Sequence, residues 1–231
     1  MKPVPLFRNR REAGRALARR VRERVHEKDC LVLALPRGGV PVGFEVALAL
    51  AAELDAFLVR KLGLPGDEEL AVGAIASGGV RVLNHDLIQE LNLSPRLIDE
   101  ITARELRELH RREAMYRVSR PRAEVRNRTV ILVDDGLATG ATMLAACRAL
   151  AQQAPATLVV AVPVAAARTC DRFRAEADLV ICLETPEPFS SVGRWYEDFT
   201  QTSDEEVRAL LARAAGRQGR LTAGFPESRG Y

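Results

Sequence analysis

Short apolar runs alternate with amphipathic stretches along most of this chain of 231 residues. Five short, mainly apolar runs predict buried strands, at residues 31–35, 56–61, 130–133, 157–162 and 179–183. Runs of this length without polar alternation are typical of strands covered on both faces. Helical periodicity predicts helices at residues 8–27, 40–54, 139–153 and about 165–175. Strands that alternate with helices indicate a three-layer α/β/α core around a mainly parallel sheet.

The middle of the chain departs from this pattern. Residues 69–76 and 80–83 predict a hairpin around the turn Ser77-Gly78-Gly79. A charged helix should follow from its cap at Ser94 to about residue 116, with a narrow apolar stripe formed by Ile98, Ile101, Leu109 and Tyr116. We expect residues 62–128 to form a lid hairpin and a helical insertion that projects from the sheet as an arm, a lid or a dimer element.

The C-terminal part is expected to complete a single domain over residues 1–231. Ser203 with Glu206 forms a capping box, which predicts a last helix that ends near residue 215. Residues 184–215 should form a small hood above the sheet, together with the N-terminal helix. Residues 216–231 are rich in Gly and Arg, and we expect them to be a flexible tail.

Composition narrows the classes of protein. The net charge of +3 does not demand a nucleic-acid partner. No apolar stretch approaches the ~20 residues of a membrane span, and the first residues lack the apolar centre of a signal peptide. We therefore expect a cytoplasmic protein without a membrane partner. The four cysteines have no C-x-x-C spacing, which favours reduced core residues over a zinc site.

Residues 130–142 read V-I-L-V-D-D-G-L-A-T-G-A-T and carry the most specific chemistry of the chain. The apolar run ends in Asp134 and Asp135, at the edge where open α/β sheets bind ligands. Small and hydroxylated residues then lead into a helix: Gly136, Ala138, Thr139, Gly140, Ala141 and Thr142. Backbone N–H groups and the helix dipole favour a phosphate there. Two acids for sugar hydroxyls beside a phosphate loop predict a sugar-phosphate site.

A second junction of strand, loop and helix lies at Pro36-Arg37-Gly38-Gly39. Arg37 can pair with phosphate oxygens, while Gly38 and Gly39 permit backbone angles closed to other residues. We expect this turn to face residues 134–142 across a cleft and to contain a strained peptide, such as a non-proline cis bond. Lys61 ends the predicted strand 56–61 and is one of only three lysines, which indicates a use for its compact charge.

The apolar run, the two acids and the T-G-x-T-type loop of residues 130–142 resemble the PRPP-binding signature of the type I phosphoribosyltransferase family. The resemblance implies transfer of ribose 5-phosphate from PRPP to a nitrogenous base, with release of pyrophosphate. Asp134 and Asp135 would then hold the ribose hydroxyls or the waters of a bound Mg²⁺. Residues 138–142 would hold the 5′-phosphate. Arg37, Gly38, Gly39 and a catalytic Lys61 would hold the pyrophosphate, under a mobile loop at residues 62–79.

The resemblance also indicates where an acceptor base would bind. The hood segment follows the strand at residues 179–183, and Phe189 or Trp195 could stack on a base. Alternatively, these aromatic residues form a small core beneath the loop. Relatives that use 6-oxopurines have an acid three residues after the second signature acid, where this chain has Ala138. Activity on hypoxanthine or guanine is therefore not expected, and the acceptor stays open.

Two other functions stay open at this stage. One is a PRPP-sensing regulator that binds its ligand, or nucleic acid, without turnover. Residues 104–128 contain nine arginines and four acids, but the interleaved glutamates favour a solvated helix over a nucleic-acid surface. The other is a hydrolase or phosphorylase that acts on a ribosyl phosphate. The sequence also leaves open whether the chain forms a homodimer.

Overall fold

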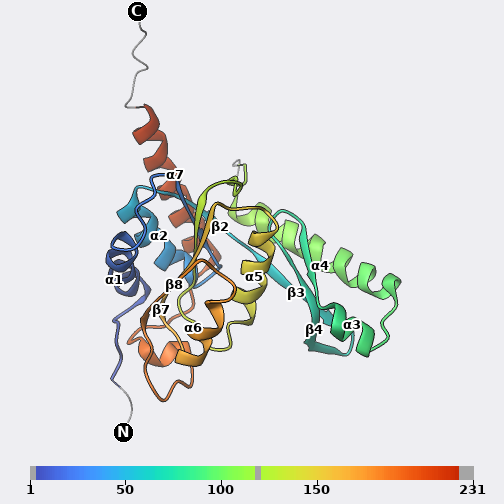
Figure 1. Ribbon diagram of the computed structural model, residues 1–231. Coiled ribbons are helices and arrows are strands. Elements are labelled where there is room, and N and C mark those ends of the chain that lie inside the picture. The colour runs from blue at the N-terminus through green and yellow to red at the C-terminus, as the bar shows by residue number, and fades with distance from the viewer. Residues whose placement is uncertain (1–3, 118–120, 224–231) are drawn as a thin grey trace, which may run out of the picture.

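The computed structural model describes residues 4–117 and 121–223, apart from the side chains of residues 68–69 and 219–223. Its centre is a parallel five-stranded sheet with the order β2-β1-β6-β7-β8 (Figure 1). The strands are β1 (Cys30–Ala34), β2 (Glu53–Ala56), β6 (Thr129–Val133), β7 (Thr157–Val164) and β8 (Leu179–Glu184). Four of the five predicted apolar runs therefore form neighbouring strands of one sheet.

Helices cover both faces of this sheet. One face packs against α1 (Arg10–Arg22), α2 (Gly39–Leu50) and α7 (Asp204–Ala223), and the other against α5 (Ala141–Ala151) and α6 (Ala167–Phe173). Successive side chains of a strand point to opposite faces, so Val32 belongs to the first core and Leu33 to the second. The predicted three-layer α/β/α architecture is confirmed.

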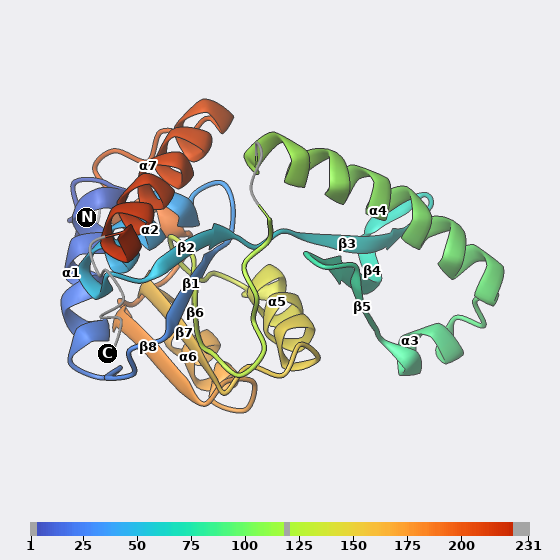
Figure 2. The ribbon, with the colours of Figure 1, turned by 90° about the horizontal axis from the view of Figure 1, so that it is seen from above.

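An arm projects from one side of this body (Figure 2). It contains the antiparallel sheet β3-β4-β5, built from β3 (Val59–Leu64), β4 (Asp67–Ala76) and β5 (Val80–Leu83), with α3 (His85–Glu90) and α4 (Pro95–Tyr116). The predicted hairpin and the capped helix are confirmed, and Ser94 Oγ accepts the Leu97 N–H at 3.3 Å. The predicted apolar stripe of α4 is buried, together with Glu105. Helix α3 was not predicted.

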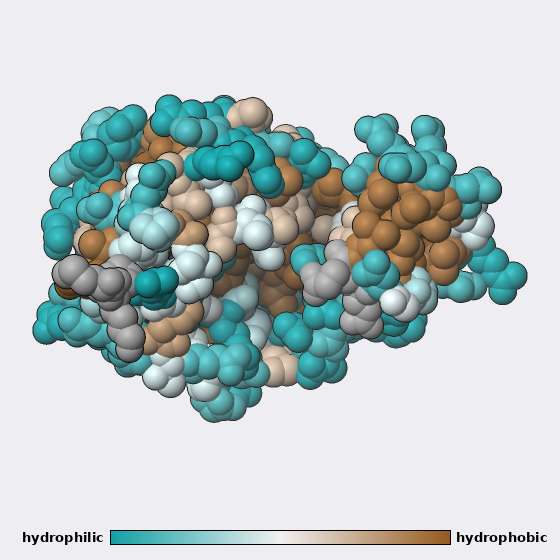
Figure 3. All heavy atoms as spheres, turned by 90° about the horizontal axis from the view of Figure 1, so that it is seen from below, coloured by the Kyte–Doolittle hydropathy of each residue, from teal (hydrophilic) through white to brown (hydrophobic). Residues whose placement is uncertain are grey.

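The arm also carries apolar side chains on its outside. Seen from below, a contiguous hydrophobic surface covers much of this part of the molecule (Figure 3). Leu91, which follows α3, is 38% exposed, and Leu87 and Ile88 of α3 are only partly buried.

The predicted strand at residues 56–61 is wrong. Strand β2 ends at Ala56, and β3 begins at Val59 in the second sheet. Between them Leu58 exchanges two hydrogen bonds with buried Ser77, from Leu58 N to Ser77 Oγ at 3.0 Å and from Ser77 N to the Leu58 carbonyl at 2.8 Å. Residues 56–58 are apolar because they are buried where the two sheets meet. Residues 62–79 consequently form strands and a turn of the arm instead of a loop over the site.

A buried ion pair fixes the other end of the arm. Arg117, directly after α4, donates to Asp55 of β2 at 3.2 Å and to the Ala56 carbonyl at 2.8 Å. Glu113 holds the same guanidinium at 3.1 Å. Asp55 is only 5% exposed and also accepts the Ala123 N–H at 3.2 Å. The arm is therefore attached at both ends to the carboxyl end of β2.

Two expectations about the periphery need correction. Cys170 of α6 and Cys182 of β8 form a disulfide, so these two cysteines are not reduced, while Cys30 and Cys147 are free and buried. Ser203 caps α7 as predicted, with its Oγ 3.1 Å from Glu206 N, but the helix continues to Ala223. Of the predicted tail, residues 216–223 are thus helical, and residues 224–231 lie outside the described part. Among the described residues, no helix has the length and apolar character that a membrane crossing requires.

Candidate active site

The predicted signature has the local structure that its pattern indicated. Asp134 and Asp135 directly follow β6 at its carboxyl end, and α5 begins at Ala141. Gly140, the residue before α5, has φ of 72°, a left-handed conformation that favours glycine. Among the described residues, the N–H groups of residues 138–142 have no acceptor. Exposed Thr139 and Thr142 therefore flank a row of donors at a helix N-terminus, which suits a phosphate.

The turn at Arg37 lies directly against the two acids. A Cβ at Gly38 would collide with Asp135 Oδ2, and one at Gly39 would lie 2.8 Å from the Val133 carbonyl. Both positions are glycine because the acids occupy the space of a side chain. The peptide between Pro36 and Arg37 is cis, as expected for this turn. Residues about 100 positions apart in sequence are thereby brought together at one edge of the sheet.

The two acids are held in a shielded, strongly polar setting. Burial raises the pKa of Asp134 well above its ordinary value, and the neighbouring charge of Asp135 raises it further. Burial also raises the pKa of Asp135, although the guanidinium of Arg10 opposes this effect. Arg10 Nε lies 2.7 Å from Asp135 Oδ2, and the Tyr196 hydroxyl donates to the Asp135 carbonyl at 2.6 Å. The site therefore concentrates negative charge that a cation or sugar hydroxyls would stabilise.

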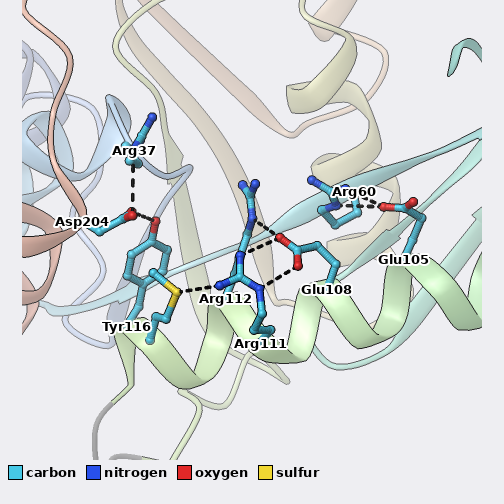
Figure 4. Close-up of polar contacts among 9 residues, drawn as sticks. Arg37, Arg60, Glu105, Glu108, Arg111, Arg112, Tyr116 and Asp204 are labelled. Carbon is cyan, nitrogen blue, oxygen red and sulfur yellow. Dashed lines mark hydrogen bonds and ion pairs between the residues drawn. The ribbon is translucent and has the colours of Figure 1, made fainter.

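A cleft of about 730 Å³ opens beside Asp135, between the body and the arm (Figure 4). Arg37 and Gly38 form its wall on the body, and Arg60 of β3 and Tyr116 of α4 form its wall on the arm. The other lining side chains include Arg10, Arg111, Arg112, Phe199, Thr202 and Asp204. Five arginines against two aspartates make this cleft a site for anions.

Lys61 does not lie in this cleft. It is an exposed residue of β3 and lines a separate cleft of about 210 Å³, which reaches Ala141 and Leu144 of α5. The structure therefore does not bring Lys61 together with Arg37, contrary to its expected place at a strand end of the parallel sheet. Neighbouring side chains of a strand point to opposite faces, and Arg60 is the one that faces the arginine-lined cleft.

The two predicted stacking residues pack together in the hood, with ring centres 6.2 Å apart. Trp195 is 4% exposed and packs with Phe7, Val164 and Tyr196, so it belongs to the small core that was the alternative interpretation. Phe189 is partly buried and lines a cleft of about 510 Å³. Arg168 and Glu187 supply the charged groups of that cleft. The N-terminal segment joins the hood as expected, since Leu6 N donates to the Trp195 carbonyl at 2.9 Å.

Sequence reasoning missed several residues around the acids. Arg10 and Tyr196 contact Asp135, and the Arg10 guanidinium lies 3.8 Å from the centre of the Phe199 ring. Arg111 and Arg112 were interpreted as part of a solvated helix, because their pairing with Glu108 at helical spacing has the same pattern. The consecutive arginines were the only local signal, and their place at the cleft depends on the arm.

Comparisons with known proteins agree with this geometry. The family model described as a phosphoribosyl transferase domain matches residues 7–197. The crystal structure of TT1426 from Thermus thermophilus is 43% identical, with a TM-score of 0.80, and the match covers 90% of this chain and 98% of that one. Two Mycobacterium tuberculosis proteins, from strains CDC 1551 / Oshkosh and ATCC 25618 / H37Rv, are each 47% identical over 211 residues, or 91% of this chain.

The names of both mycobacterial proteins assign them provisionally to the phosphoribosyl transferases. The chain spans about half the length of these curated relatives, since the match covers 47% of each. The family model, in contrast, includes β1, the two acids, the loop at residues 136–142 and the first part of the hood. The chain belongs to the phosphoribosyl transferase domain family.

Proposed function

We propose that this protein transfers ribose 5-phosphate from PRPP to a nitrogenous base and releases pyrophosphate. The observation that carries the proposal is the direct packing of Gly38 and Gly39 against Asp134 and Asp135. This packing brings an arginine-bearing turn against the two acids, which lead directly into the loop at residues 136–142. A sugar that carries a phosphate at one end and a pyrophosphate at the other would find a group for each of its parts in these three elements.

Each group of residues would bind the part of PRPP that matches its chemistry. The N–H groups of residues 138–142 and the hydroxyls of Thr139 and Thr142 would bind the 5′-phosphate. Asp134 and Asp135 would accept hydrogen bonds from the ribose hydroxyls, and Arg37 would neutralise the pyrophosphate. Charge develops on the ribose ring as the bond to pyrophosphate breaks, so catalysis would consist of positioning and of electrostatic stabilisation of the leaving group.

The acids also fit a Mg²⁺ ion that accompanies the pyrophosphate. Mg²⁺ is usually held by one or two carboxylates together with waters and substrate phosphates, and Asp134 and Asp135 supply such a pair. Among the described residues there is no cluster of three or more metal-ligating side chains. A metal held jointly by substrate and protein suits this donor set better than a metal held by the protein alone. When bound, the ion would neutralise charge on the pyrophosphate.

The acceptor is best accommodated in the cleft at Phe189. The ring offers a flat apolar surface for a base, and Arg168 and Glu187 provide one positive and one negative partner for its polar edge. Trp195 is buried and is not proposed as the platform. With Ala138 in place of the 6-oxopurine acid, hypoxanthine and guanine are expected to be poor acceptors.

The test is a screen of nucleobases and related nitrogen heterocycles with PRPP and Mg²⁺, measured as release of pyrophosphate. Turnover with at least one acceptor is expected, and it should fall by about 10²–10³-fold in Asp135→Asn. PRPP binding without turnover on any acceptor would favour a regulator that senses PRPP. Release of pyrophosphate without an acceptor would favour a hydrolase.

A further inference from the structure

The arm supplies cationic groups to the cleft that the phosphate signature does not contain. Arg60, Arg111 and Arg112 line it from β3 and α4, opposite Arg37 on the body (Figure 4). Every cation in the lining is an arginine, whose planar guanidinium can bind two phosphate oxygens at once. The carboxylates of the lining are Asp135 and Asp204. Glu105 pairs with Arg60, and Glu108 pairs with Arg111 and Arg112. These three arginines therefore face two carboxylates, and a net positive charge remains beside α4.

Glu108 holds Arg111 and Arg112 in place. Its Oε2 accepts from Arg111 Nε at 2.7 Å, and its Oε1 accepts from Arg111 Nη2 and from Arg112 Nε, both at 2.9 Å. These bonds lower the pKa of Glu108 to about 2, so the carboxylate is ionised at neutral pH. Among the described residues, no partner occupies Nη1 or Nη2 of Arg112. A fixed guanidinium with free donors is suited to an anionic ligand.

The arm that carries these arginines is tied to the body close to the cleft. The Tyr116 hydroxyl donates to Asp204 of α7 at 2.5 Å, and Arg37 approaches the same carboxylate at 3.9 Å. The ion pair of Arg117 with Asp55 follows directly after Tyr116. Tyr116 lies four and five residues after Arg112 and Arg111, which is little more than one helical turn. The two arginines are therefore held at a fixed position relative to Arg37.

We propose that Arg111 and Arg112 bind the pyrophosphate group of PRPP, so that the arm is a permanent wall of the active site. The proposal rests on the proposed function, because PRPP is the ligand that it names. Arg37 would contact the pyrophosphate from the body, and Arg60, Arg111 and Arg112 would contact it from the arm. In this arrangement the insertion provides leaving-group contacts without closure of a mobile loop. Glu108 would act as a positioning residue.

The test is isothermal titration calorimetry on the full chain, with inorganic pyrophosphate as the first ligand and PRPP as the second. Arg111→Gln/Arg112→Gln should weaken binding of both ligands by at least about tenfold, the loss expected for one or more charge-assisted hydrogen bonds. The matched control is Arg96→Gln on the same helix, about 22 Å away along its axis. Arg96 is exposed and outside the cleft, so this variant should bind like the parent protein.

Glu108→Gln adds a readout that distinguishes positioning from direct contact. It keeps both arginines and releases their guanidiniums, so binding should weaken less than in the double variant. Each variant is first checked by thermal unfolding. If the double variant does not fold, Arg112→Gln alone is expected to weaken pyrophosphate binding, because its free nitrogens make the proposed contact.

The outcomes separate this proposal from the proposed function. If pyrophosphate binding depends on Arg111 and Arg112 but no acceptor supports turnover, the anion site stands and the transferase activity fails. If the protein turns over PRPP while the double variant binds pyrophosphate normally, the transferase activity stands and this assignment fails. A parent protein that does not bind pyrophosphate, or a double variant that loses only salt-dependent binding of nucleic acid, also overturns the assignment.

Discussion

The body and the arm contribute to the same cleft in opposite ways. On the body, Asp134, Asp135 and residues 136–142 are contiguous, and they lie where β6 ends and α5 begins. On the arm, Arg60 and Arg112 come from a strand and a helix that are 52 positions apart (112 − 60 = 52). The body therefore encodes its part of the site in one local motif. The arm encodes its part in the packing of α4 on β3, with no sequence motif.

The body and the arm should therefore differ in which substitutions they tolerate. The loop at residues 136–142 depends on local backbone geometry, which the pattern of strand and helix specifies over a few residues. The arginines of the arm depend on distant anchors, among them Asp55 with Arg117 and Tyr116 with Asp204. Changes at these anchors should therefore affect the arm far more than the signature, and changes at the acids should do the reverse.

The largest effect on stability is expected from Arg117→Leu. This change removes the guanidinium from Asp55, which stays buried with its charge, at a cost of about 3–5 kcal/mol in free energy of unfolding. Urea denaturation measures the loss. The control Arg107→Leu, at an exposed position of α4, should change stability by less than about 0.5 kcal/mol. Equal stability of the two variants would show that the buried pair does not anchor the arm.

The hood permits a direct contrast between Phe189 and Trp195. Trp195→Ala should destabilise the protein by about 3–5 kcal/mol, because the side chain fills a core. Phe189→Ala should cost less stability than Trp195→Ala, because Phe189 is only partly buried against this core. It should weaken acceptor binding about tenfold or more, since stacking contributes on the order of 1–3 kcal/mol. Denaturation curves and parallel titrations with PRPP and the best acceptor separate the two. An unaltered acceptor affinity in Phe189→Ala would move the acceptor site elsewhere.

Asp135→Asn tests the body without a large change in shape. It removes the charge that we propose faces the ribose and weakens the pair with Arg10, and kcat/KM should fall by about 10²–10³-fold, as for loss of a preorganised electrostatic group. The measurement is steady-state release of pyrophosphate. Asp198→Asn is the control, because that carboxylate is on the exposed hood and bonds to Thr200. Comparable activities in the two variants would contradict the role of the acids.

The smallest effect is expected at the contact between arm and body. Tyr116→Phe removes a hydrogen bond to a carboxylate and should cost about 1.5–3 kcal/mol. Burial and then the bond to Asp204 raise the pKa of Tyr116 from 10.0 to about 12. The advantage of the parent protein should thus be complete below pH 10 and should disappear as the pH rises towards 12. A difference in stability that is constant up to pH 12 would exclude this bond as its source.

The sequence alone determined the architecture of the body and the location of the acids. Apolar runs without alternation mark strands buried on both faces, and the step from such a run into Asp134 and Asp135 marks a strand end. Because Gly38 has no side chain, the predicted turn can pack directly against the predicted acids. These features were predictable because each depends on a few adjacent residues.

Only the tertiary structure decided the remaining features. The change of sheet at Phe57 and Leu58 was invisible, because an apolar residue is equally suited to either sheet, and it moved Lys61 out of the cleft that Arg60 lines. The burial of Trp195 depends on Phe7, nearly 190 positions away in the chain. The arginines of α4 have the periodicity of a solvated surface, and only the packing of the arm turns that surface towards Asp135. A local pattern specifies burial, whereas the identity of the partner is set by the whole fold.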